Sequence, residues 1–182
     1  MLFRSGALIT RPEILTRAIV TGGTEEQKHG WLPQIATGER IVGVMVTEPD
    51  YGSDVAGVKV TATPDGDGWR INGVKTWCTF AGRADTLMLL ARTDPDRSKG
   101  HRGLSVFVVE KPPASGHHFA FEDGQGGKME GRAIDTLGYR GMHSYEVAFD
   151  DWHVPGSALI GDRKSTRLNS SHVSESRMPS SA

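Results

Sequence analysis

The sequence predicts an α+β chain, in which a short helical part is followed by a mainly all-β domain built as a small barrel or a sandwich. Three observations support this class. The 182 residues include 23 glycines and 9 prolines, scattered between short apolar runs, which favours a turn-rich β domain. From residue 40 onward, β-branched runs of strand length alternate with turn residues. Helix signals lie before residue 40.

Two helices are expected in the first part of the chain. The first is predicted over Pro12–Val20 and ends at Gly22-Gly23. The second begins with the capping box Thr24–Gln27, in which a Thr N-cap is followed three residues later by Gln. It is predicted to run to about Ala36 and to stop near Gly38. Pro33 predicts either a kink or a late boundary within it.

The remainder of the chain reads as strands and turns. Asp65–Gly68 is a turn sequence between two alternating runs and predicts a hairpin. Asp94–Gly103 and Pro112–Lys128 are polar, glycine-rich and predicted to be loops. The predicted strands are Ile41–Val46, Val58–Thr63, Trp69–Asn72, Lys75–Thr79, Thr86–Arg92, Leu104–Glu110 and Ser144–Phe149.

Composition excludes several classes of function. The net charge is −1 with both signs interleaved, so we expect no binding to nucleic acid or to an anionic membrane. The single cysteine rules out a disulfide framework and indicates a cytoplasmic location. No apolar run approaches the ~20 residues that span a bilayer. No metal site is expected, because Cys or carboxylate partners at metal-ligand spacing are lacking for His117, His118, His143 and His153. Gly124–Gly127 is predicted to be a flexible loop, not a dinucleotide fingerprint.

Both ends of the chain differ in composition from its middle. Residues 163–182 are rich in Ser and Arg and nearly free of apolar side chains. Such a segment cannot bury enough surface to offset the entropy of ordering, so we expect disorder. Residues 163–182 and 1–5 also resemble translated sequencing-adaptor read-through. We therefore expect both ends to be foreign to the domain.

Two short segments, Val44–Asp54 and Asn72–Thr79, carry the most distinctive chemistry. Thr47 and Thr79 offer hydroxyl donors from strand positions, and Trp77 precedes Thr79 by two residues, which predicts a shared strand face. An oxidised flavin requires donors at N5 and at its carbonyl oxygens, with an aromatic or apolar cover on one ring face. These residue types therefore suit a flavin.

The loop after Thr47 adds two candidates. Gly52 permits close approach of the backbone to a ligand, and Ser53 can donate to a phosphate or a carbonyl. Taken singly, each residue has a plainer interpretation. A strand Trp is commonly a core residue, a strand Thr is a good strand former, and Gly-Ser-Asp is an ordinary loop.

The order of these motifs resembles one enzyme family. Thr-Glu-Pro-x-x-Gly-Ser-Asp-x-x-Gly over Thr47–Gly57 is similar to the first signature of the acyl-CoA dehydrogenases. Ile-Asn-Gly-x-Lys-x-Trp-x-Thr over Ile71–Thr79 resembles their next block. Gly23–Lys28 with Leu32-Pro33 resembles the helix that leads into their middle domain, and Leu137–Pro155 their closing strand. The resemblance spans about Gly23 to Asp162.

The resemblance implies an α+β fragment: a mainly all-β middle domain (a small β-barrel) over residues 40–162, preceded by the last helices of an N-terminal helical domain over residues 6–39. It implies FAD, an acyl-CoA substrate, reoxidation by an electron-transferring flavoprotein, and a homo-oligomeric full-length parent. The basic loop that holds Arg102 is a solvated loop or a contact to CoA phosphates. The cofactor-binding candidates are Val44, Met45, Val46, Thr47, Gly52, Ser53, Trp77, Cys78 and Thr79, and the substrate-binding candidates are Ser53 and Arg102.

The reaction implied is α,β-desaturation of an acyl-CoA, in which a Glu removes the α-proton while hydride passes from Cβ to flavin N5. The Glu of the family would lie after Asp162, so no catalytic residue is assigned here and we expect the chain alone to be inactive. Two alternatives remain at this point: an acyl-CoA oxidase of the same superfamily, and a non-enzymatic β-barrel binding module.

Overall fold

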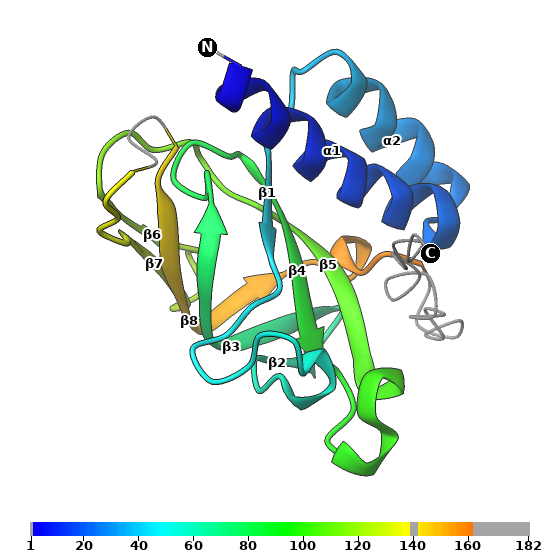
Figure 1. Ribbon diagram of the computed structural model, residues 1–182. Coiled ribbons are helices and arrows are strands. Elements are labelled where there is room, and N and C mark those ends of the chain that lie inside the picture. The colour runs from blue at the N-terminus through cyan, green and yellow to red at the C-terminus, as the bar shows by residue number, and fades with distance from the viewer. Residues whose placement is uncertain (1, 139–141, 162–182) are drawn as a thin grey trace, which may run out of the picture.

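A computed structural model describes residues 2–138 and 142–161, with the backbone alone for residues 2–10. Two helices lie side by side at the N-terminal end, α1 (Leu2–Gly22) and α2 (Glu25–Ala36) (Figure 1). The predicted capping box is confirmed: the Thr24 hydroxyl accepts from the Gln27 amide, and the Gln27 side chain accepts from the Thr24 amide. Pro33 lies inside α2, and Gly38 follows its C-cap with a φ of 75°.

Helix α1 is longer than predicted. Proline suits the first turn of a helix, which is why the prediction began at Pro12. Pro12 instead lies inside the helix, which starts at Leu2 and includes residues 2–5 of the segment expected to be foreign. Leu15 and Ile19, on the turns after the proline, are completely buried and hold the helix against the sheet. The expected tail over 163–182 lies outside the described residues.

The described strands form one curled sheet (Figure 1). Its order is β1-β4-β2-β3-β8-β7-β6, with β5 paired to β4. The β1–β4 and β2–β4 pairs are parallel and the others antiparallel. The strands are β1 (Val42–Met45), β2 (Thr61–Asp65), β3 (Gly68–Thr79), β4 (Thr86–Arg92), β5 (Leu104–Glu110), β6 (His118–Glu122), β7 (Lys128–Ala133) and β8 (Ser144–Val154). Short 3₁₀ turns are η1 (Val55–Gly57), η2 (Arg97–Gly103) and η3 (Gly156–Ala158). The predicted fold class, helices followed by a mainly all-β domain, is confirmed, and the sheet expected as a small barrel is a curled half-barrel.

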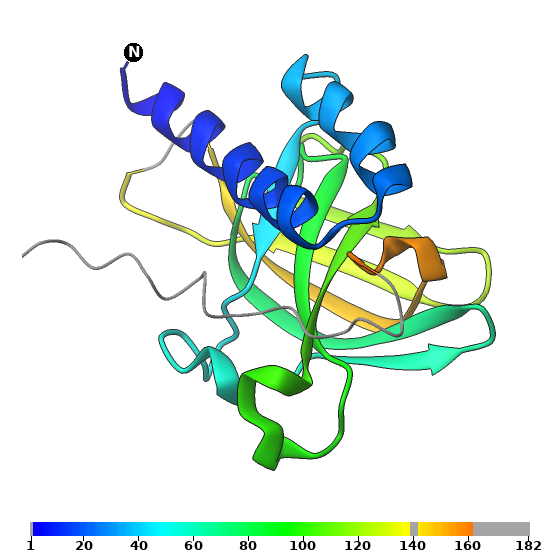
Figure 2. The same ribbon diagram turned by 90° about the vertical axis from the view of Figure 1, so that its right-hand side faces the viewer.

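The curled sheet is buried on both faces in its β1–β4–β5 part. Leu87, Leu89 and Phe107 point into the core enclosed by the sheet, whereas Met88 and Val108 pack under the two helices. Figure 2 shows both helices lying over one face of the sheet. A strand covered on both sides reads as a continuous apolar run, and β4 and β5 were accordingly predicted with their observed bounds.

Several predictions about the other strands were wrong. The strand expected over Val58–Thr63 is β2 at Thr61–Asp65, and the strand expected to end at Phe149 continues to Val154 as β8. The strands expected over 69–72 and 75–79 form one strand, β3, because Gly73 accommodates a φ of 123° where a bulge would otherwise break the ladder. The loop expected over 112–128 contains β6, and β7 was missed. The β6–β7 hairpin alternates Phe119 and Met129 inward with polar residues outward, over runs too short to read from sequence.

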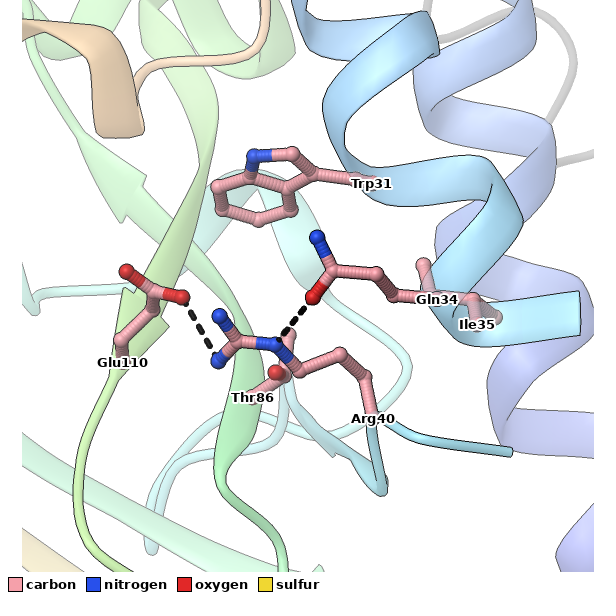
Figure 3. A pocket seen from close by; sticks show the side chains of 6 residues that line it. All are labelled: Trp31, Gln34, Ile35, Arg40, Thr86 and Glu110. Atoms are coloured by element: carbon pink, nitrogen blue, oxygen red, sulfur yellow. Dashed lines mark hydrogen bonds and ion pairs between the residues drawn. The ribbon is translucent and has the colours of Figure 1, made fainter. Parts of the chain in front are cut away.

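The α2 helix is tied to the segment after β8 and, through the residues that follow the helix, to the end of β5. The Gln27 amide donates to the carbonyls of Ser157 and Leu159 at 2.9 and 2.6 Å, and its oxygen accepts from Gly161 at 3.1 Å. At the other end of the helix, Arg40 pairs with Glu110 at 2.7 Å and donates to Gln34 at 2.9 Å (Figure 3). This junction borders a small cavity lined by Trp31, Gln34, Ile35, Arg40, Thr86 and Glu110.

A buried lysine closes the end of β5. Lys111 is 5% exposed and donates to the carbonyls of Gly82, Ala84 and Pro112 at 2.8, 2.7 and 3.0 Å. Its ammonium also lies over the rings of Phe119 and Phe121, at 4.8 and 5.5 Å from their centroids. Burial lowers the pKa of Lys111 to about 8. The lysine thus joins the loop after β3 to the β6–β7 hairpin.

Candidate functional site

The two segments singled out in the sequence lie against each other in the fold. The Thr76 amide donates to the Thr47 carbonyl at 2.9 Å, and the Lys75 ammonium donates to the Val46 carbonyl at 2.9 Å. The end of β1 is therefore bonded to the second half of β3. The Val46–Thr47 and Lys75–Thr76 segments, which are separated in sequence by the β2–β3 hairpin turn, therefore lie next to each other in the fold.

A buried ion pair lies directly beneath this junction. Lys75 Nζ is 2.8 Å from Glu48 Oε1, and the two side chains are 0% and 4% exposed. The same carboxylate accepts from the Lys59 and Val60 amides at 2.7 and 2.9 Å. Burial lowers the pKa of Lys75, and the hydrogen bond to Glu48 opposes that effect. Neither residue was predicted as functional, although a Glu after a buried strand and a Lys within an apolar strand were available signals.

The end of β3 departs from regular alternation at Trp77. The register with β8 shifts between Lys75 and Cys78, and Trp77 adopts a left-handed φ of 55°. Trp77 is 56% exposed, whereas Cys78 is completely buried. Thr79 is half-buried and shares a 2.9 Å hydrogen bond with the Ser144 hydroxyl. An exposed tryptophan held in a strained backbone conformation is unusual and points to a role outside the core.

The remaining candidates on β1 and β3 are packed residues. Met45 and Cys78 are completely buried in the core enclosed by the sheet, so their side chains fill the domain and only their backbone can face a ligand. Burial raises the pKa of the Cys78 thiol to about 12, which keeps it protonated and inert. Val44 and Val46 are half-buried and pack against the cluster under the helices.

Gly52 and Ser53 lie in an exposed loop whose shape is set from both sides. Glu48 and Tyr51 form a reciprocal backbone bridge at its start. Further on, the buried Arg92 donates to the carbonyls of Ala56 and Val58 at 2.7 and 3.3 Å. A Cβ on Gly52 would meet nothing within 4 Å, and its φ is not left-handed, so this chain itself does not require glycine there.

The basic loop expected near the substrate lies beside this one. Turns η1 and η2 are in contact, at the end of the sheet away from the helices (Figures 1 and 2). Ser53 and Arg102 are both exposed there. Within this loop, Asp94 forms an ion pair with Lys99, and the Asp96 carboxylate accepts a hydrogen bond from the Ser98 amide. The structure thus brings the two substrate-binding candidates to the same end of the molecule.

Other features of the described residues carry no comparable chemistry. A larger open groove lies elsewhere, along Thr63, Pro64, Asp65, Arg70, Asn72, Gln125, Gly126 and Asp151, and includes none of the flavin candidates. Within residues 2–138 and 142–161 no group of three or more His, Cys, Asp or Glu is placed to hold a metal ion. No helix of that part is long and apolar enough to cross a membrane. Tyr139–Gly141, part of the closing motif, lies outside the described residues.

Comparison with known proteins decides the family. Residues 43–152 match the family model described as acyl-CoA dehydrogenase, middle domain. The chain belongs to this family. The matched range begins in β1 and ends in β8, so it covers the sheet and every cofactor-binding candidate named from the sequence.

Individual relatives agree with this assignment. The chain is 43% identical over 156 residues to a (2S)-methylsuccinyl-CoA dehydrogenase of Cereibacter sphaeroides, covering 86% of this chain and 28% of that protein. It is 34% identical to a mitochondrial isovaleryl-CoA dehydrogenase of Pongo abelii, covering 79% and 31%. A crystal structure of an acyl-CoA dehydrogenase from Geobacillus kaustophilus superposes with a TM-score of 0.67 at 37% identity, covering 81% of this chain and 36% of that one. The chain spans about a third of the length of these relatives.

Proposed function

We propose that this chain is the flavin-cradling part of an FAD-dependent acyl-CoA dehydrogenase. The observation that carries the proposal is the bonding of the Val46–Thr47 segment to the Lys75–Thr76 segment, since it joins the two motifs that offer flavin contacts. Family membership supports the same conclusion. The domain limits inferred from the sequence, helical over 6–39 and flavin-binding over 40–162, are part of this proposal.

The residues present fit a flavin. Trp77 is 56% exposed, and its indole is the kind of aromatic group that covers one face of a flavin ring. Thr47 and Thr79 are half-buried hydroxyls on rigid strand ends, and the exposed Ser53 adds a third donor on the adjoining loop. When bound, FAD would accept a hydride from the acyl chain. The chain's own contribution is to hold and orient the cofactor through these four residues.

The substrate contacts proposed for this chain are limited to one end of the sheet. Ser53 and Arg102 would meet the acyl-CoA there, and the Arg102 guanidinium suits a CoA phosphate. Two of the relatives are named for methylsuccinyl-CoA and isovaleryl-CoA, so we propose a CoA thioester as the substrate class. An electron-transferring flavoprotein as acceptor, a homo-oligomeric parent and a cytoplasmic location complete the proposal. No residue of this chain is proposed as the base, so we expect the chain alone not to turn over substrate.

The test is a visible absorption spectrum of the gene-complete protein, meaning the product of the complete reading frame around this chain. We expect bound flavin absorbance that is bleached anaerobically by one member of a CoA-thioester panel, with methylsuccinyl-CoA and isovaleryl-CoA included. Flavin that no thioester bleaches would remove the substrate class but keep the cofactor. A colourless protein that takes up no added FAD would overturn the proposal. Rapid reoxidation of the bleached flavin by oxygen would identify an oxidase instead.

A further inference from the structure

The buried Glu48–Lys75 pair binds three backbone groups. The carboxylate binds the amides of Lys59 and Val60, and the ammonium binds the Val46 carbonyl. Since Val46 precedes the exposed loop and Lys59 follows it, the loop that carries Gly52 and Ser53 has both of its ends fixed to one ion pair.

Stability alone does not account for such a pair. Moving two charges out of water costs free energy that their attraction often only balances, and apolar replacements of similar volume are frequently as stable. A fully satisfied buried pair does, however, fix geometry. Glu48 uses both oxygens and Lys75 has two acceptors, so rotation of either side chain would break bonds to the backbone.

The same pair also controls the strand end that faces the proposed cofactor. Lys75 is followed directly by Thr76, which binds the Thr47 carbonyl, and then by the strained Trp77. Arg92 supports the loop from a second side, where it donates to the carbonyls of Ala56 and Val58 near the end of the loop. Glu48 and Lys75, together with the Thr76–Thr47 backbone bond, therefore hold the register between the two flavin-facing segments.

We propose that Glu48 and Lys75 are positioning residues for flavin binding: they hold Thr47, Ser53 and Trp77 in one fixed arrangement without touching the cofactor. This inference rests on the proposed function. It predicts that breaking the pair weakens flavin binding by more than the accompanying loss of stability explains.

Four variants of the gene-complete protein test the inference: Lys75→Met, Glu48→Gln, the double variant, and Met129→Ala as a matched control. Met129 is completely buried on β7, away from the two segments, so its truncation destabilises the same core without touching the loop. Each variant is titrated with FAD below its unfolding temperature. Amide hydrogen exchange is followed in peptides that contain Lys59, Val60 and Thr76.

We expect the FAD dissociation constant to rise about 10- to 100-fold in both single variants, as for one or two misplaced hydrogen bonds. Exchange at residues 59, 60 and 76 should accelerate in parallel. The double variant should regain thermal stability, because no unpaired charge remains, yet keep the weakened binding. Met129→Ala should lose stability with FAD affinity and local exchange unchanged.

The inference is overturned if FAD affinity follows thermal stability across all four variants, or if both single variants bind FAD as the wild type does. Recovery of affinity in the double variant would also contradict it, because the effect would then come from the unpaired charge. A wild-type protein that binds no FAD overturns the proposed function, and the inference with it. The wild-type titration thus separates the two failures.

Discussion

The two lysines buried in the described part of the chain, Lys75 within β3 and Lys111 directly after β5, are held in contrasting ways. Lys75 is paired with a carboxylate that also gathers backbone amides, and it lies under the candidate site. Lys111 forms no ion pair within the described residues and is held by three carbonyls and two phenylalanine rings. The ion pair of Lys75 fixes the position of several backbone groups around it. Lys111 instead fills the space between the loop after β3 and the β6–β7 hairpin. A buried cation can therefore organise a site or fill a space, and its acceptors distinguish the two.

The largest effect is expected for Lys75→Met. Glu48 would be left as a buried, unpaired carboxylate, and such losses cost about 3–5 kcal/mol of unfolding free energy. Urea unfolding of the chain at neutral pH measures this. A loss below that for Lys111→Met would break the comparison, because it would mean that the carboxylate finds another partner.

A smaller effect is expected for Lys111→Met. Methionine keeps much of the apolar stem, so the loss is confined to the carbonyls left without a donor, about 1–3 kcal/mol. Unfolding measured as for Lys75→Met gives the value. Equal losses for the two lysine variants would show that the ion pair adds nothing beyond burial.

The pH dependence of the Lys111 effect sharpens the comparison. The pKa of Lys111 is lowered to about 8 in the folded chain, so between about pH 8 and 10.5 the unfolded state binds more protons. Wild-type stability therefore gains from this residue as pH rises, by at most about 1.4 kcal/mol per pH unit, and Lys111→Met lacks that gain. Cys78 titrates in the opposite sense but is present in both chains and cancels from the difference. A wild-type-minus-variant difference that stays constant from pH 7 to 10 would contradict this.

At the exposed end of β3, substitutions should affect stability only slightly. Glycine tolerates the left-handed φ of 55° at position 77 and alanine does not, so Trp77→Gly should exceed Trp77→Ala in unfolding free energy by about 1 kcal/mol. Both should weaken FAD binding alike, since both remove the indole. Equal stability of the two variants would mean that the strain is relieved elsewhere.

The smallest effect is expected at the helix–sheet junction. The Arg40 and Glu110 side chains are 35% and 54% exposed, so Glu110→Gln should cost no more than about 1 kcal/mol. Thermal unfolding at low and high salt checks this, and a salt-insensitive loss above that size would mark the pair as structurally important. It is the exposed counterpart of the Glu48–Lys75 pair.

The sequence predicts those parts of the fold whose signals are local. The capping box at Thr24 and the apolar strands β4 and β5 were located correctly, because hydrogen bonding and two-sided burial leave direct patterns. The β6–β7 hairpin was missed because its inward residues, Phe119 and Met129, are isolated among polar ones. These two residues are buried because the sheet curls over them, and a short stretch of sequence carries no signal for that curl.

The candidate site shows the same division. Thr47, Trp77 and Thr79 were found from residue type and order, and their roles remain predictions. Glu48 and Lys75 were overlooked because their pairing crosses from one strand end to another and exists only in the folded chain. The shared face of Trp77 and Thr79 was predicted from regular alternation, whereas the backbone there contains a bulge and a left-handed residue. Exposure of Trp77 follows from that irregularity.

The side chain of Gln27 has a consequence for the order of folding during synthesis. Its amide group forms hydrogen bonds with Ser157, Leu159 and Gly161, all of which lie more than a hundred residues later in the sequence. On the ribosome these bonds cannot form until nearly the whole described chain has emerged. Until then α2 has its N-terminal capping box but not its bonds to the segment after β8. The apolar residues of α1 and α2 likewise become buried only after the sheet has formed.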